Sequence, residues 1–97
     1  MPIKPYIDPF PKAGQPFYVN FGSNEDATGT VSVLVGDVER TFLLDDDDDP
    51  SVDVPSGLPV RRKISGYGPA TANDRVTLRV APGDGPGGVG VDSKVFI

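Results

Sequence analysis

The chain has 97 residues and a net charge of −5 at pH 7, with 37% hydrophobic residues, 12 Gly, 11 Pro, and no Cys or His. This length fits a single domain, residues 1–97, with one two-layer core and no disulfide. Without His and Cys, the commonest general base and the thiol nucleophile are missing, so we expect no enzyme. No run approaches the roughly 20 apolar residues of a membrane span. No signal peptide is visible at the N-terminus.

The N-terminal part of the chain alternates apolar and polar residues in short runs that turn signals separate. A period of two predicts strands with one buried face. We expect a Pro-rich extended segment over residues 2–11, then strands over residues 17–21 and 30–35. The inward residues of these two strands are expected to be Phe17, Val19, Phe21, Val31, Val33 and Val35.

Gly36 and Asp37 lie between two valines and indicate a tight hairpin. Gly at the first central position is typical of a type II′ turn, because that residue has a positive φ. We expect the next strand to run from Val38 to Leu44, with apolar residues on both faces at its end.

The segment from residue 45 to residue 59 contains an acidic run and three prolines, which exclude a central strand. Val52 and Val54 could still form a short edge segment. The strand that follows, over residues 58–65, has Arg62 on the same phase as its inward residues Leu58, Val60 and Ile64. We expect Arg62 either to lie at a sheet margin or to be displaced by a bulge.

Two further strands are predicted in the C-terminal third. Alternation is clearest over residues 75–80, where Val76, Leu78 and Val80 are expected to point inward. A Gly-rich loop over residues 82–88 precedes the last strand. There the expected buried face consists of Val89, Val91, Val95 and Ile97.

Seven strands in this length predict an all-β, seven-stranded antiparallel immunoglobulin-like sandwich, with the spacing of immunoglobulin-like and fibronectin-type-III-like modules. The antibody branch is excluded, because the Cys-Trp-Cys pattern is absent. Residues Pro9–Phe21, the polar loop 22–27 and residues Thr30–Asp37 resemble the opening of CARDB-type and related bacterial immunoglobulin-like adhesion modules. There an Ala-Gly turn leads to a strand, a polar loop and a second strand that ends in a Gly/Asp hairpin.

The resemblance covers about the first 44 residues and implies a non-catalytic structural or adhesive module. The chain also looks like the small immunoglobulin-like domains that decorate phage particles. We therefore expect display on a bacterial cell surface or on a virion. The expected partner is a protein, a surface or a neighbouring module of a longer chain.

Loops at the ends of such sandwiches are where partner contacts are expected. The candidate partner-binding residues are Asn24, Glu25, Asp26 and Tyr67. We expect Tyr67, which lies between two glycines, to be exposed. Tyr6, Tyr18 and Tyr67 could also form a carbohydrate-stacking platform. The simpler expectation is that one of these tyrosines is a core residue whose hydroxyl bonds the backbone.

The net charge comes from one acidic run, Asp45, Asp46, Asp47, Asp48 and Asp49, since the other nine acidic residues match the nine Lys and Arg. Without a basic stripe, we expect no nucleic-acid partner. The run is the one candidate metal site, because Ca²⁺ prefers six to eight oxygen ligands. A Ca²⁺-dependent glycan-binding module that uses this run and Tyr67 is the alternative function.

The spacing of the acidic run does not match a known calcium loop. It lacks the alternating ligands, the Gly and the terminal Glu of an EF-hand. We therefore expect no cofactor. The simpler interpretation is a solvated acidic loop that blocks edge pairing and faces Arg61, Arg62 and Lys63.

Overall fold

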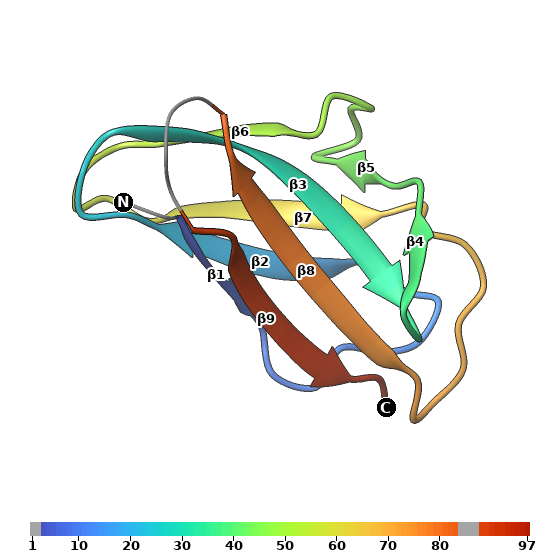
Figure 1. Cartoon of the computed structure of the whole chain (residues 1–97). Coiled ribbons are helices and arrows are strands. Elements are labelled where there is room, and N and C mark those ends of the chain that lie inside the picture. Colours follow the sequence, from blue (N-terminus) through green and yellow to red (C-terminus); the bar gives the residue numbers. More distant parts are fainter. Residues whose placement is uncertain (1–2, 84–87) are drawn as a thin grey trace.

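Two antiparallel β-sheets form the computed structural model, which describes residues 3–83 and 88–97 (Figure 1). The first sheet has the order β1 (Lys4–Ile7), β2 (Phe17–Gly22), β7 (Val60–Ser65) and β5 (Leu43–Leu44). The second has the order β4 (Val38–Arg40), β3 (Ala27–Val35), β8 (Arg75–Pro82) and β9 (Gly90–Val95), and β6 (Ser51–Val54) also pairs with β3. The fold is all-β and sandwich-like. The described residues include no helix long and apolar enough to cross a membrane.

The core lies between the two sheets and is built from the inward rows that alternation predicts. The first sheet contributes Phe17, Val19, Phe21 and Ile64, and the second contributes Val31, Val33, Val35, Val76, Leu78 and Val80. All ten are at most 4% exposed. Because β-branched side chains pack well on a pleated surface, these rows fix which face of β2, β3 and β8 turns inward.

Nine strands are present in the described residues where the sequence predicted seven. The expected strand over residues 38–44 is divided: β4 pairs with β3 in the second sheet, and β5 pairs with β7 in the first. The physical reason is the edge of β3, which β6 already occupies over residues 27–30. Strand β4 pairs with residues 33–35 of that edge, the Val31 N–H donates to the Pro50 carbonyl oxygen just before β6, and the chain between β4 and β6 crosses to the other sheet. The edge segment expected at Val52 and Val54 is β6.

The hairpin at Gly36 and Asp37 is confirmed, since Val35 pairs with Val38. Its turn type differs from the prediction. Gly36 has φ 58° and Asp37 has φ 68°. Two positive φ values define type I′ rather than type II′, and Asp is one of the few residues that tolerate this conformation.

The buried face expected for the last strand is wrong. Val89, Val91, Val95 and Ile97 are 42–55% exposed, while Phe96 is 1% exposed. The inward phase of β9 consists of Gly90, Asp92 and Lys94, which pair with the inward residues of β8. The N-terminal segment occupies this side: a Cβ atom at Gly90 would overlap the carbonyl oxygen of Ile3. The Ile7 N–H also donates to Asp92 Oδ2 at 2.7 Å.

Arg62 lies in an unbroken register with β2, opposite Val19, so no bulge displaces it. Its side chain is 36% exposed, because β5 covers only the end of β7. This is the sheet margin that the sequence offered as one explanation. Leu58, expected to point inward, is instead 64% exposed before the strand begins.

Candidate functional site

The candidate partner residues Asn24, Glu25 and Asp26 lie in the β2–β3 loop and are exposed. This loop is tied to the β6–β7 connection. Ser56 N–H donates to Asp26 Oδ1 at 2.8 Å, and Ser56 Oγ donates to the carbonyl oxygen of Asn24 at 3.0 Å. The three residues therefore sit at one end of the sandwich in a bonded loop.

Tyr67 is buried, so the expectation that it is exposed is wrong. It is 3% exposed, and its ring centroid lies 5.5 Å from that of Phe17 and 5.7 Å from that of Phe96. Its hydroxyl donates to the carbonyl oxygen of Gln15 at 2.6 Å. Burial raises its pKa above the usual value near 10.0. Tyr67 is the core tyrosine with a backbone bond, and the platform of three exposed tyrosines does not form.

Tyr67 also lies at the opposite end of the sandwich from the β2–β3 loop. It follows β7, which runs antiparallel to β2, and it bonds the segment before β2. The four candidate partner residues thus do not form one surface.

The acidic run begins as a tight turn that closes the edge of the first sheet. Leu44 and Asp47 exchange backbone hydrogen bonds, and the central residues Asp45 and Asp46 have φ values of 53° and 66°. The Asp45 N–H donates to the Lys63 carbonyl oxygen at 2.9 Å, and Asp45 Oδ1 accepts from the Lys63 N–H at 2.9 Å. These bonds satisfy backbone groups of β7 beyond the reach of β5, so the turn protects an open edge.

The carboxylates of the acidic run point to different partners. Asp45 pairs with Arg62 at 2.8 Å, and Asp46 pairs with Lys63 at 2.9 Å. Asp47 accepts from the Asp49 N–H, and Asp49 accepts from the Ser51 N–H. Within the part of the chain that the structure describes, no three Asp or Glu side chains are placed to hold a metal. Arg62 and Lys63 face the run as expected, whereas Arg61 does not.

Three carboxylates with lowered pKa values make the stability of the fold depend on pH. Hydrogen bonds from Arg62 and from the Lys63 backbone hold the pKa of Asp45 below its usual value near 3.8. Bonds from the backbone N–H and the hydroxyl of Ser51 lower the pKa of Asp49, and the same groups of Thr71 lower the pKa of Asp74. A lowered folded-state pKa adds stability above the unfolded value, and this is lost as the pH falls through the folded value.

We therefore expect the melting temperature to decrease when the pH is lowered past about 4, where Asp residues of the unfolded chain begin to take up protons. Asp45→Asn should flatten this fall, because Asn tolerates the positive φ but does not titrate. Thermal unfolding followed by circular dichroism, from neutral pH to pH 2, measures this dependence of the melting temperature on pH. Asp37→Asn, in the β3–β4 turn, removes the same charge elsewhere and should keep the full fall. Equal acid sensitivity of Asp45→Asn and the unchanged chain would contradict the assignment.

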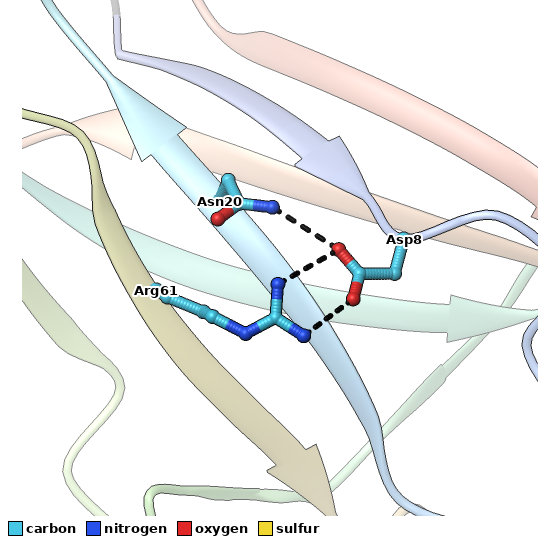
Figure 2. Close-up of polar contacts among 3 residues, drawn as sticks. All are labelled: Asp8, Asn20 and Arg61. Carbon is cyan, nitrogen blue, oxygen red and sulfur yellow. Dashed lines mark hydrogen bonds and ion pairs between the residues drawn. The ribbon is translucent and has the colours of Figure 1, made fainter.

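The outer face of the first sheet carries a cluster of side chains from β1, β2, β7 and the residue that follows β1, and three of them bond one another (Figure 2). We call it the tyrosine face: Tyr6, Asp8, Tyr18, Asn20 and Arg61. Strand register sets its layout, because Tyr6 lies opposite Asn20, and Asn20 lies opposite Arg61. Asp8 follows β1, and its N–H donates to the Tyr18 carbonyl oxygen at 3.0 Å.

Asp8 is the centre of the cluster. Arg61 Nη1 and Nη2 donate to Asp8 Oδ1 and Oδ2 at 3.2 and 2.6 Å, and Asn20 Nδ2 donates to Oδ1 at 3.1 Å (Figure 2). A bidentate Arg–carboxylate pair fixes the guanidinium plane in addition to its position. The guanidinium carbon of Arg61 lies 4.5 Å from the centroid of the Tyr18 ring, in cation–π geometry. The network therefore orders one exposed aromatic side chain before any partner arrives.

The members of the tyrosine face remain accessible although they are ordered. Tyr6 is 57% exposed and Tyr18 is 41% exposed. The side chain of Arg61 is 53% exposed. Alternation already places Tyr18 and Asn20 on the outward phase, but the sequence does not reveal that β1 and β7 flank β2. Sequence reasoning missed the cluster for that reason.

Comparisons with protein-family models, with curated proteins and with solved structures find no match for this chain. The fold itself defines the class, an all-β, sandwich-like protein with two antiparallel sheets.

Proposed function

We propose that this chain is a non-catalytic, immunoglobulin-like interaction module that binds a protein partner through the tyrosine face. Its setting would be a bacterial cell surface or the outside of a phage particle. The strand order supports the immunoglobulin-like part. In immunoglobulin domains, strands A, B, E and D form one sheet and C, F and G the other. The orders β1-β2-β7-β5 and β3-β8-β9 match this scheme, with β4 and β6 as additions beside β3.

The observation that carries the proposed function is the ordered, exposed Tyr18–Arg61–Asp8 cluster on the outer face of the first sheet. Aromatic residues and Arg are enriched at protein interfaces, and Tyr and Arg dominate binding energy there. Because Arg61 is already held by Asp8, little side-chain freedom is lost on binding. A broad row of side chains across three strands suits a protein surface, while small molecules favour concave pockets.

Co-sedimentation of the purified chain with intact cells or particles of its source tests the proposal. We expect the unchanged chain to bind and the double variant Tyr6→Ser with Tyr18→Ser to bind about 30-fold or more weakly, the size of one strong interface residue. Val38→Ser is the matched control, because Val38 is 58% exposed, like Tyr6, but lies in β4 of the other sheet. Binding that survives the double variant, or no binding of the unchanged chain, would contradict the proposal.

A further inference from the structure

Strand β9 is the outer strand of the second sheet and presents an edge of its own (Figure 1). The Phe96 N–H donates to Asp74 on the β8 side, whereas Ile97 exchanges bonds with Pro11 and Ala13 on the other side. Backbone groups alternate along a strand, so those of Val91, Ser93 and Val95 point away from β8. Among the described residues, these groups have no backbone partner on that side.

Space is available beside this edge. An open hollow of about 290 Å³ lies between β1 and β9, lined by Lys4, Pro5, Tyr6 and residues 89–92. Unpaired edge groups and exposed valines together form a template for another strand. Val91 is 55% exposed and Val95 is 42% exposed, both on the outer side of the sheet.

The sequence of β9 is self-complementary about Ser93. When two copies of β9 pair antiparallel around a two-fold axis at Ser93, each Val91 lies opposite Val95 of the second copy. Each Asp92 lies opposite Lys94, and the pairing ends before Ile97, whose edge groups already bond Pro11 and Ala13. Opposite charges and apolar pairs directly across a ladder are stabilising.

Charge also selects this register against its neighbours. Residues whose backbone groups point toward the edge must pair with residues of the second copy whose groups also point toward the edge. Alternative registers are therefore limited to those that keep such residues opposite one another. A shift one way places Asp92 opposite Asp92, and a shift the other way places Lys94 opposite Lys94. Like charges directly opposite are destabilising, so the pairing centred on Ser93 is preferred.

Edge pairing also fits the basic residues beside the valines better than face-to-face packing does. Arg79 pairs with Val91 and Arg75 pairs with Val95, which places two cations on the outer face of the sheet. Two such faces packed together would oppose like charges. In an edge-to-edge dimer, the β8 strands are three strand spacings apart, about 14 Å. This exceeds the screening length of about 8 Å at physiological salt.

We propose that two copies of this chain form a symmetric dimer by antiparallel pairing of their β9 edges, with the two-fold axis at Ser93. The dimer joins the two second sheets into one continuous sheet. Of the tyrosine face, Tyr6 lines the hollow beside β9, whereas Tyr18 and Arg61 do not, so the dimer does not depend on the proposed partner.

Sedimentation velocity across a concentration series tests the dimer, and cysteine cross-linking tests its register. The chain has a mass of 10.2 kDa and no Cys. We expect a concentration-dependent species of twice this mass. Hydrogen-bonded cross-strand Cα atoms are about 5.5 Å apart, which suits a disulfide. Ser93→Cys should therefore form an intermolecular disulfide under mild oxidation. Thr77→Cys, on β8 opposite Ser93, is the matched control and should remain largely reduced.

Two variants that keep the fold should weaken the dimer. Ser93→Pro removes an edge N–H, and Pro is tolerated on edge strands when that N–H faces away from the sheet. Lys94→Asp places like charges opposite Asp92 twice and should raise the dimer dissociation constant about tenfold or more. Circular dichroism verifies the fold of each. A chain that stays monomeric at all concentrations, or Ser93→Cys that cross-links no faster than Thr77→Cys, would overturn the proposal.

Discussion

Replacing Tyr67 by Ala should lower the free energy of unfolding by about 3–5 kcal/mol, the range for a buried aromatic residue. The ring packs between Phe17 and Phe96, and the residue is 3% exposed. Its loss leaves a cavity where the two sheets meet and removes the hydroxyl bond to Gln15. Small domains are stable by only about 5–15 kcal/mol. Urea unfolding monitored by circular dichroism measures the change.

Two further variants separate the roles of ring and hydroxyl. Tyr67→Phe keeps the ring and should cost only about 1 kcal/mol, because it leaves one carbonyl without its donor. Leu58→Ala is the exposed control, since Leu58 is 64% exposed, and should change the unfolding free energy by less than about 0.5 kcal/mol. If Tyr67→Ala were as mild as Leu58→Ala, Tyr67 would be a surface residue and the core described for it would be wrong.

Alternation predicts the faces of β2, β3 and β8 because each of these strands has neighbours on both sides in its sheet. Val31, Val33 and Val35 form one continuous apolar row, and only one phase buries it. For these strands, the local order of apolar and polar residues is sufficient to predict the buried face.

The same reasoning fails at β9, where the period is right and the face is wrong. A period of two fits either face, and the choice depends on which segment covers the strand. Here the backbone of Ile3 and Ile7 occupies the inner side, and Asp92 provides an acceptor for Ile7. This contact spans 85 residues and leaves no local signal. Because this contact turns the other face of β9 inward, the valines of β9 are exposed.

The functional residues show the same division between local and distant information. Tyr67 between two glycines looks like a loop tip, but its hydroxyl bonds Gln15, 52 residues earlier. A run of five Asp suggests a metal site, but the Asp45 and Asp46 carboxylates pair with Arg62 and Lys63, which lie on β7, outside the local sequence of the run. The tyrosine face needs β1, β2 and β7 side by side, an order that alternation alone does not supply.

Gly90→Ala should lower the free energy of unfolding by about 1–3 kcal/mol, the usual cost of added volume in a packed site. The added Cβ would overlap the carbonyl oxygen of Ile3 and approach Pro5 Cδ at 2.9 Å. Neither atom is the end of a flexible side chain, so the N-terminal segment must move away from β9. Ile3, which is 4% exposed, would then leave the core.

Gly22→Ala is the matched control for this variant. Gly22 ends β2, and an added Cβ there meets nothing within 4 Å. This change should leave stability within about 0.5 kcal/mol or raise it slightly, because Ala restricts the unfolded chain. Urea unfolding of both variants side by side makes the comparison. Equal stabilities would mean that the N-terminal segment does not pack beneath β9. That packing would then no longer explain why the valines of β9 face outward.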